Sequence, residues 1–321
     1  MINKFFVLLL ISFTVNIAGC GVEKNDNVVN QIYNSDICHY GNSIYYITYE
    51  NNLVLNKYNT WNNNIETLVS KDGGGLTSIC VVGNIVYYLS LENYDTITLN
   101  KFDGENKMEL LKTDYNINTK NLFLTYVNDK LFFFNGNSLY TMEKEEIKLL
   151  KTGMKYVYIF NNEICYVLDD GVYFCDFSGN NEYMVLDKSE INNKYISNIL
   201  RIDDTLYFIL SDDELWRYGN LYKYNLTEKT LEKQSEDILY TEFQIYDEDM
   251  YFTGCVYSDN GRETGLFKKN LNNEKIEKLY SKNISSFFVD DKGVYLTCVD
   301  EDFEVIVIDK KGKETILEKN N

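Results

Sequence analysis

The sequence predicts an all-β protein, a seven-bladed β-propeller built from four-stranded antiparallel sheets. A short phrase of apolar and aromatic residues recurs seven times, usually behind a turn pair such as Gly41-Asn42 or Gly83-Asn84. The copies are Ile44-Tyr45-Tyr46, Val86-Tyr87-Tyr88, Leu131-Phe132-Phe133, Ile164-Cys165-Tyr166, Leu206-Tyr207-Phe208, Met250-Tyr251-Phe252 and Val294-Tyr295-Leu296. Their middle residues are 42, 45, 33, 42, 44 and 44 residues apart. A period of about 40–45 residues with several short strands in each unit is typical of propeller blades.

The pattern within one repeat predicts the four strands of a blade. In the second repeat the strands are expected over residues 78–82, 85–90, 96–102 and 107–112, with Asp103-Gly104 as a hairpin turn. The second strand, from Ile85 to Leu89, is apolar at every position, as in a sheet covered on both faces. The fourth strand alternates in Lys107-Met108-Glu109-Leu110, which fits an outer edge exposed to water. Sheets packed face to face around a ring satisfy both patterns.

Seven phrases imply seven blades, although the short fourth repeat leaves rings of six or eight blades open. The last fourth strand, expected over Glu314 to Glu318, belongs to the last repeat itself. Closure of the ring by an N-terminal strand is therefore not required by the pattern. The stretch from Val28 to Tyr33 is a candidate for one added strand.

The N-terminus predicts export. Lys4 precedes an apolar run from Phe5 to Val15, which is too short to span a bilayer and fits a secretory signal. Ile17-Ala18-Gly19-Cys20 resembles the bacterial lipobox, and this resemblance implies cleavage before Cys20 and lipidation of its sulfur, with palmitate among the expected acyl groups. The alternative is an ordinary signal peptide with a chance cysteine. The expected organisation is a signal peptide over 1–19, a lipidated tether over 20–34 and a propeller over 35–319.

The charge balance limits the partners. The chain has 31 Lys and Arg residues against 49 Asp and Glu residues, a net charge of −18. Loss of the first 19 residues, which contain Lys4 and no acid, would make it −19. Such a chain lacks the basic footprint of a nucleic-acid binder and a polybasic grip on lipid. We therefore expect no nucleic-acid partner, and membrane contact through the lipid anchor only.

A second recurring phrase carries a family resemblance. The third strands repeat Leu55-Asn56-Lys57-Tyr58-Asn59, Leu99-Asn100-Lys101-Phe102-Asp103, Leu221-Tyr222-Lys223-Tyr224-Asn225 and Leu266-Phe267-Lys268-Lys269-Asn270. With the aromatic phrase, this is similar to the YWTD-type propeller of low-density-lipoprotein-receptor proteins, which is also found in bacterial lipoproteins. The resemblance covers Ser35 to Lys319. The nearest copies of the motif, Tyr45-Tyr46-Ile47-Thr48 and Tyr251-Phe252-Thr253-Gly254, lack its final aspartate, so no ligand contacts carry over.

No catalytic residue, metal site or cofactor is expected. The single histidine, His39, lies in a first strand without a nucleophile motif, which favours a structural role. Paired acids such as Asp169-Asp170 and Asp290-Asp291 occupy turns, where aspartate bonds its own backbone. No cysteines have CxxC spacing. Cys165 and Cys175 flank a turn and leave a disulfide open, with free thiols as the default interpretation.

Loop lengths locate a candidate ligand site. From the middle of the second strand to the third-strand phrase the separations are 10, 12, 7, 7, 14, 15 and 10 residues, so blades five and six have the longest connections. All these connections lie on one rim, and loops on a rigid scaffold often carry function. The candidate ligand-binding residues are Trp216, Arg217, Tyr218, Tyr257, Asp259 and Arg262. Trp, Tyr and Arg are the residue types enriched at binding hot spots.

These observations predict a non-catalytic recognition module, lipid-anchored on the bacterial cell membrane and facing away from the cytoplasm. Its partner would be a protein or glycan ligand. One alternative is a propeller hydrolase or lyase that acts on cell-wall or extracellular polysaccharide. A second alternative is a structural subunit of an envelope assembly.

The lipobox resemblance gives the first testable prediction. Cys20→Ala removes the thiol that would be alkylated, so the variant should incorporate no fatty acid and should be released or retained as precursor. Metabolic labelling with a radioactive fatty acid checks this, with Cys38→Ala as the matched control. Equal label in the Cys20 variant would contradict the lipoprotein assignment.

Overall fold

The computed structural model describes residues 36–49, 53–71, 74–92, 95–115, 122–160, 162–212, 218–259, 261–273, 275–298 and 304–317. In this part of the chain the strands form seven separate four-stranded antiparallel sheets, each built from four consecutive strands. The seven-bladed propeller is thereby confirmed. No helix among the described residues has the length and apolar character needed to cross a bilayer. The tether, Cys20 and the Val28–Tyr33 candidate strand lie outside the described residues.

The blades follow chain order. The first four are made of β1 (Ile37–Tyr40), β2 (Ser43–Tyr49), β3 (Leu53–Asn59), β4 (Asn64–Lys71), then β5 (Gly75–Val82), β6 (Ile85–Glu92), β7 (Thr96–Phe102), β8 (Lys107–Asp114), then β9 (Phe123–Val127), β10 (Lys130–Phe134), β11 (Ser138–Glu143), β12 (Glu146–Thr152), then β13 (Tyr156–Ile159), β14 (Glu163–Val167), β15 (Gly171–Asp176), β16 (Tyr183–Asp187). The last three are made of β17 (Tyr195–Ile202), β18 (Thr205–Ser211), β19 (Asn220–Asn225), β20 (Thr230–Lys233), then β21 (Ile238–Tyr246), β22 (Asp249–Ser258), β23 (Gly261–Asn270), β24 (Ile276–Tyr280), then β25 (Ile284–Val289), β26 (Gly293–Cys298), β27 (Glu304–Asp309), β28 (Glu314–Ile316). A short 3-10 helix, η1 (Lys188–Ile191), connects blades four and five.

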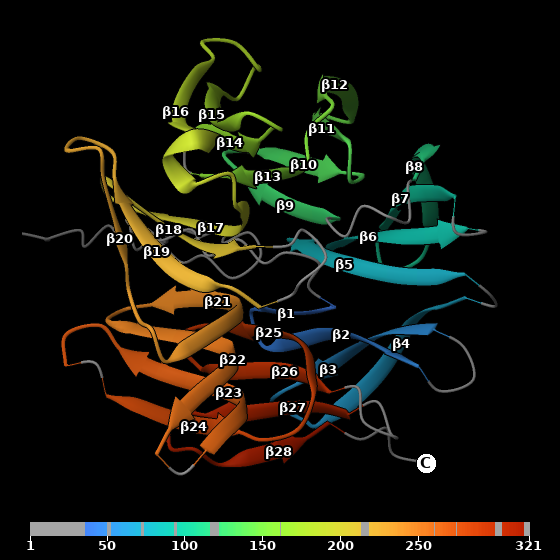
Figure 1. Cartoon of the computed structure of the whole chain (residues 1–321). Coiled ribbons are helices and arrows are strands. Elements are labelled where there is room, and N and C mark those ends of the chain that lie inside the picture. Colours follow the sequence, from blue (N-terminus) through green and yellow to red (C-terminus); the bar gives the residue numbers. More distant parts are fainter. Residues whose placement is uncertain are drawn as a thin grey trace, which may run out of the picture.

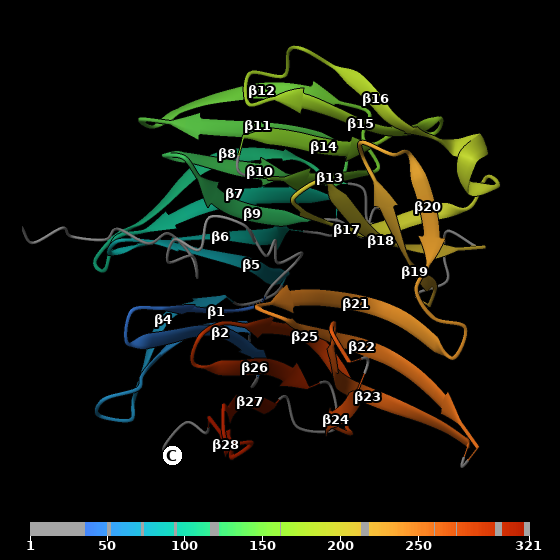
Figure 2. The same cartoon turned by 90° about the vertical axis from the view of Figure 1, so that its left-hand side faces the viewer.

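The first strand of each blade lies near the centre of the ring and the fourth lies at the periphery (Figure 1). Seen from the side, β5 to β20 form one half of the ring, and β1 to β4 with β21 to β28 form the other (Figure 2). The strands of blade two agree with the ranges expected from the sequence to within three residues at every end. The repeat phrase therefore marks the second strand correctly in all seven blades.

The hydrophobic core lies between neighbouring sheets. In β6, Val86 to Leu89 are buried without interruption, so both faces of the strand are dry. Val86 and Tyr88 pack with blade one, whereas Tyr87 and Leu89 pack with blade three. The fourth strand β8 is mostly exposed. This division explains the continuous apolar second strands and the alternating outer strands, because only the former are covered on both faces.

None of the six described cysteines forms a disulfide bond. Cys165 and Cys175 are not opposite each other, because Cys165 pairs with Phe174 and Cys175 with Ile164. A shift of one residue places the two side chains on opposite faces of the sheet. Accordingly, Cys165 packs between blades four and five and Cys175 between blades three and four. The register rules out the disulfide that the sequence left open.

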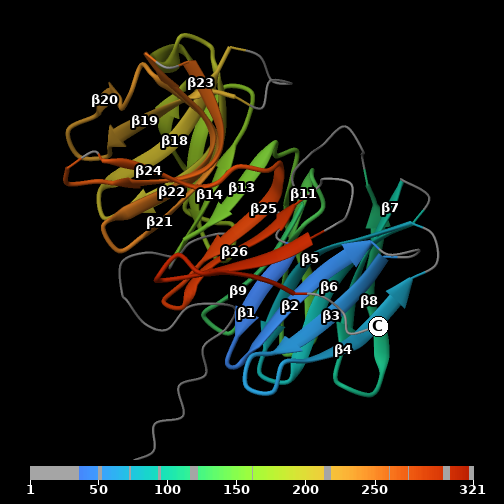
Figure 3. The same cartoon turned by 90° about the horizontal axis from the view of Figure 1, so that it is seen from below.

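The ring closes without a shared blade. Blades one and seven are each complete, and β1 lies beside β25 and β26 (Figure 3). Their contact buries Ile37, Ile44 and Tyr46 of blade one against Phe288 and Tyr295, with Val305 and Leu317, of blade seven. We call this contact the closing seam.

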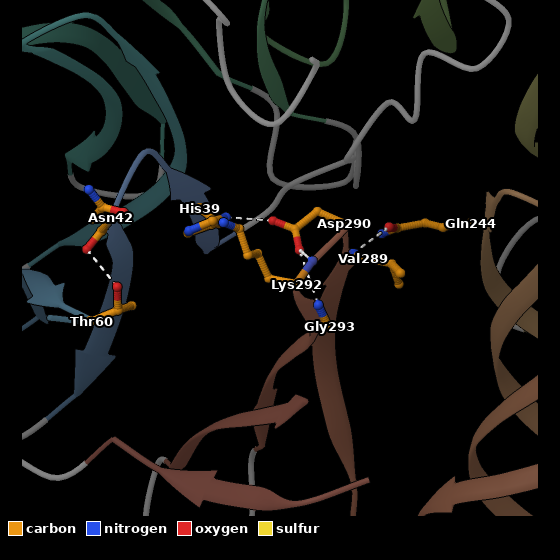
Figure 4. Close-up of polar contacts among 8 residues, drawn as sticks. All are labelled: His39, Asn42, Thr60, Gln244, Val289, Asp290, Lys292 and Gly293. Atoms are coloured by element: carbon orange, nitrogen blue, oxygen red, sulfur yellow. Dashed lines mark hydrogen bonds and ion pairs between the residues drawn. The ribbon is translucent and has the colours of Figure 1, made fainter. Parts of the chain in front are cut away.

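His39 forms the polar part of the closing seam. Its Nδ1 atom lies 2.5 Å from the Asp290 Oδ2 atom, and its ring stacks on Tyr295 at a centroid distance of 5.3 Å. Asp290 also accepts hydrogen bonds from the backbone N–H groups of Lys292 and Gly293 at 2.7 and 3.2 Å (Figure 4). His39 and Asp290 are both buried. The structural role expected for His39 fits this position.

Gln244 joins the inner strands of blades six and seven. Its side-chain amide donates to the Phe287 carbonyl oxygen at 2.7 Å. It also accepts from the Val289 N–H group at 3.1 Å, the bond drawn in Figure 4. These two bonds satisfy backbone groups on the free edge of β25, as a neighbouring strand would. Gln244 is 1% exposed, so water does not compete for these groups.

Gln244→Leu is expected to lower the free energy of unfolding by about 2–4 kcal/mol, because it leaves the Phe287 carbonyl and Val289 N–H groups buried without partners. Urea denaturation measures the change. The matched control is Gln234→Leu, since the Gln234 side chain makes only a 3.4 Å bond to a nearby carbonyl. That control should change stability by less than about 0.5 kcal/mol. Equal effects in the two variants would contradict the bridging role.

Candidate functional site

The two rims of the propeller carry different connections. Since the strands of a blade alternate in direction, the turns between second and third strands share a rim with the connections from one blade to the next. We call this the connection rim, and the other the opposite rim. The candidate residues Tyr218, Tyr257, Asp259 and Arg262 all lie on the connection rim, in blades five and six. Trp216 and Arg217 lie outside the described residues.

In blade six the long connection expected from the sequence is a β-hairpin. β22 and β23 each run for ten residues and pair as far as Ser258 and Gly261. Asp259 is exposed at the tip. Gly254 and Gly265 are opposite each other where the hairpin leaves the blade. A Cβ atom would lie 2.1 Å from the Leu239 oxygen at Gly254 and 2.1 Å from the Tyr280 oxygen at Gly265, so only glycine permits this close approach.

Tyr218, Tyr257 and Arg262 are brought together on this hairpin. Tyr257 and Arg262 are direct cross-strand partners, so their side chains share a face. The Arg262 guanidinium donates to the Cys255 sulfur, with Nη2 at 2.9 Å and Nε at 3.3 Å. Its carbon lies 5.8 Å from the centre of the Tyr218 ring, a cation–π arrangement. The structure thus brings three of the six candidate residues together, and 42% of the Tyr257 surface is exposed.

Tyr218 is held in place by a link between blades five and six. The adjacent Gly219 exchanges two backbone hydrogen bonds with Tyr240 of β21, at 2.9 and 2.8 Å. A Cβ atom on Gly219 would lie 2.5 Å from the Leu210 oxygen, so this position also requires glycine. The link fixes the Tyr218 backbone beside the hairpin.

A second part of the connection rim was missed by the sequence reasoning. A small, half-open pocket lies between blades four and five, around Tyr195 at the start of β17. Its polar edge is made by Lys155, Lys188 and Lys194, all half-buried. Its aliphatic side is lined by Val167, Leu168, Ile191 and Ile196. We call this the lysine pocket.

The lysines of the pocket surround one aromatic ring. The Nζ atoms of Lys188 and Lys155 lie 5.3 and 5.8 Å from the centre of the Tyr195 ring. Lys155 pairs with Asp169 at 2.8 Å and Lys194 with Asp212 at 3.1 Å, and these two acids are exposed. The Lys155 ammonium hydrogen-bonds the Asp169 carboxylate and lowers the pKa of Asp169. Lys188 makes no ion pair with any described acid.

Local sequence chemistry positions this edge. Asp187 caps η1 by accepting a hydrogen bond from the Ser189 N–H group. The Glu190 carboxylate in turn accepts a hydrogen bond from the Asp187 N–H group. Asn192 and Asn193 then adopt left-handed conformations with φ of 55° and 60°. These residues turn the chain between Lys188 and Lys194, which both line the pocket. A count of the blade-to-blade connections, in addition to the turns within blades, would have drawn attention to this segment.

Two acids lie at equivalent places in their blades, Asp36 just before the inner strand β1 and Glu242 within the inner strand β21. Asp36 precedes Ile37, the partner of Tyr46, and Glu242 precedes Phe243, the partner of Phe252. Asp36 accepts a hydrogen bond from the Thr77 hydroxyl at 3.0 Å, but burial dominates and raises its pKa to about 6. Burial also raises the pKa of Glu242 to about 8. Within the described residues no group of three or more His, Cys, Asp or Glu side chains is arranged to hold a metal ion.

Glu242 should make stability depend on pH. With its pKa raised from 4.5 to about 8, the folded state binds the proton more tightly than the unfolded state between these pH values. Stability should therefore fall as the pH rises through this window. Glu242→Gln cannot ionise, so its melting temperature should exceed that of the wild type by about 3 °C or more at pH 9 but not at pH 4.

Melting curves between pH 4 and pH 9 test this prediction. Glu109→Gln, which changes an exposed acid on β8, serves as the control and should follow the wild type at every pH. A constant difference between Glu242→Gln and the wild type across the range would contradict the proposed titration.

Comparison with known proteins supports the fold. No protein-family model matches the chain, and no curated protein matches it. Among solved structures, the puromycin-hydrolysing peptidase of Mycobacterium tuberculosis superposes with a TM-score of 0.60 at 11% identity, over 91% of this chain and 53% of the peptidase. The chain thus spans about half the length of that peptidase.

Two further structures match over nearly their whole length. The β-propeller domain of the Trilobed protease from Pyrococcus furiosus, which has an open velcro topology, gives a TM-score of 0.60 at 14% identity, over 91% of this chain and 98% of the domain. Oligogalacturonate lyase from Vibrio parahaemolyticus gives 0.57 at 11% identity, over 94% and 96%. Identities this low establish a shared propeller fold and leave the activity to be argued from the site.

Proposed function

We propose that this chain is a lipid-anchored recognition module on the bacterial cell surface that binds a protein or glycan ligand without catalysing a reaction. The observation that carries the proposal is the collection of basic and aromatic side chains on the connection rim of blades four to six. Tyr218, Tyr257 and Arg262 lie at one end of this region and the lysine pocket lies at the other. Acids of the same rim, such as Asp169, Asp212 and Asp259, lie among these cations, so the region offers both charges together with aromatic rings.

Several basic side chains of this region are held in place. Arg262, Lys155 and Lys188 lie beside tyrosine rings, which restricts their side chains before a ligand arrives. Restriction in advance lowers the entropy lost on binding. Tyrosine and arginine are also the residue types whose removal most often weakens an interface. The YWTD-type assignment and the lipid anchor belong to the same proposal and follow from the sequence resemblances alone.

A binding measurement tests the role of the rim. Residues 25–321, which include all the described blades, are screened against glycan and peptide arrays, and the affinity of the strongest hit is measured. The double variant Tyr218→Ala with Arg262→Gln should bind at least about tenfold more weakly, because it removes the paired anchor of the hairpin. Trp61→Ala is the control, since Trp61 is 80% exposed on the opposite rim.

The melting temperature of each variant confirms folding. Unchanged affinity in a folded double variant, or an equal loss in the Trp61 control, would remove the connection rim from consideration.

The hydrolase or lyase alternative also has an observation in its favour. Glu242 has a raised pKa on an inner strand, and proteins with similar propellers include peptidases and a lyase. Raised acid pKa values occur at catalytic sites, although buried structural acids show them too. Conversion of the bound array ligand, lost in Glu242→Gln, would favour this alternative over simple recognition.

The envelope-subunit alternative rests on the outer strands. Met108 of β8, Leu149 of β12 and Tyr183 with Met184 of β16 are large apolar side chains with 52%, 54%, 49% and 43% of their surface exposed. They lie on consecutive blades. Self-association in analytical ultracentrifugation, abolished by Leu149→Lys, would favour this alternative.

A further inference from the structure

We infer that the Glu242 carboxyl group, together with the Thr241 and Thr253 hydroxyls, binds the protonated amine of an amino sugar such as a glucosamine residue. This site lies on the inner strand β21 and its partner β22, and it is separate from the rim residues of the proposed function. Two observations lead to it: a carboxyl group without a partner, and neighbouring hydroxyls that can only accept further hydrogen bonds.

The Glu242 carboxyl group lacks a partner. Within the described residues it makes no hydrogen bond or ion pair, and burial is the one cause that raises its pKa. The equivalent acid in blade one, Asp36, accepts a hydrogen bond from the Thr77 hydroxyl at 3.0 Å. Part of the Glu242 surface is nevertheless exposed, so a ligand can reach it. A recessed carboxyl group of this kind favours a cation, because a nearby positive charge stabilises its ionised form.

Glu242 faces blade seven. It pairs with Thr253 in a regular part of the ladder, and Gln244 follows two residues later, so Glu242 and Gln244 lie on one face of β21. The Gln244 side chain reaches the edge of β25 at Phe287. On β25, Ser285 precedes Phe287 by the same two residues, and Ser285 is exposed. The carboxyl group therefore lies where the inner strands of blades six and seven adjoin, on the side of Gln244 nearer the connection rim.

The hydrogens of the neighbouring hydroxyls are already used. The Thr241 hydroxyl donates to the Thr253 carbonyl oxygen at 3.0 Å. The two hydroxyl oxygens lie 2.7 Å apart, and Thr253 is the donor of this second bond because the single Thr241 hydrogen is engaged. Both oxygens keep free lone pairs, and both residues are partly exposed. The two hydroxyls therefore offer acceptors to a ligand and no donor.

Acceptors without donors select a ligand that donates. An ammonium group has three donors and no acceptor, and an ionised carboxylate only accepts. The net charge of −18 also attracts a cation to the chain. In glucosamine the amine and a hydroxyl lie on neighbouring carbon atoms, so one sugar residue supplies donors to Glu242 and to the threonines. A lysine side chain carries its ammonium on an apolar stem without a second donor. The site therefore favours an amino sugar over a peptide amine.

Binding should release a proton. Burial raises the pKa of Glu242 to about 8, so the free site holds a protonated carboxyl group at pH 6. When the ammonium group binds, the carboxyl proton passes to the buffer and the complex contains one carboxylate and one ammonium. Calorimetry at pH 6 in two buffers with different ionisation enthalpies measures this transfer. The expected value is roughly one proton released for each bound oligosaccharide.

Matched ligands test the chemical class. The probe is a glucosamine tetramer, and the control is the N-acetylglucosamine tetramer, whose nitrogen atoms carry no charge. The glucosamine tetramer should bind at least about tenfold more tightly at about 0.15 M salt, where attraction between exposed charges is largely screened. A blocked peptide of four Gly-Lys repeats carries as many ammonium groups. It should bind at least about tenfold more weakly than the glucosamine tetramer.

Variants locate the site. Glu242→Gln keeps the shape of the side chain and cannot ionise, so it should weaken binding of the glucosamine tetramer by at least about tenfold and abolish the proton release. Thr253→Val removes one acceptor and should weaken binding about threefold. Glu109→Gln removes an exposed acid on β8 and should change neither quantity. Melting temperatures at pH 6 confirm that the variants fold.

The outcomes separate this inference from the proposed function. Equal affinity for the two tetramers, no binding of either, or binding without proton release would overturn it. An equal loss in Glu109→Gln would do so too, because it would show unspecific attraction to the acidic chain. Tighter binding of the lysine peptide would assign the site to a peptide amine instead. The variant Tyr218→Ala with Arg262→Gln should bind the glucosamine tetramer like the wild type, so the array measurement decides the proposed function independently.

Discussion

The packing of blade one against blade seven is the contact on which the ring depends. Each of these blades is complete, so no strand is exchanged between the ends of the described chain and no backbone ladder closes the ring. Within the described residues, side chains hold the closing seam: an apolar layer around Ile37 and Phe288, and the buried pair of His39 and Asp290. Such a pair contributes modestly when intact but is costly to break, because the remaining partner stays buried without its counterpart. The seam therefore requires a specific arrangement of these side chains. Because it closes the ring, the positions of the sites on both rims depend on it.

The sequence was sufficient to predict the blades because each blade is built from four strands that are consecutive in the chain. The Ile-Tyr-Tyr phrase and its turns specify strands that pair with their immediate neighbours, and this pattern also placed Tyr257 and Arg262 together through the hairpin register. Contacts between blades could not be predicted from the repeat in this way. His39 and Asp290 are 251 residues apart, and nothing in either repeat marks the other. Gln244 looks like any polar residue in a strand until its amide is seen along the edge of β25. The lysine pocket escaped notice because it is built from a connection between repeats, which periodicity does not describe.

The candidate site combines a rigid frame with few long loops. Glycines at positions 254 and 265 permit close backbone contacts at the base of the blade-six hairpin. Gly219 forms a backbone link between blades five and six. In the lysine pocket the capped turn of η1 performs the same task. Both parts place cations against tyrosine rings, which keeps the charges in position and partly desolvated. A few basic groups are held in this way although the whole chain is strongly acidic.

The proposed anchor and the proposed ligand are consistent in geometry. The first strand β1 begins on the connection rim, because every first strand runs from that rim to the opposite one. A lipid on Cys20 would therefore be joined to the rim that carries the site. The fifteen residues from 20 to 34 span at most about 50 Å when fully extended. A folded partner wider than the reach of this tether would have to compete with the bilayer for space beside the rim, whereas an extended segment needs only a narrow approach. An anchor on this side thus favours a slender ligand at the rim over a bulky folded one.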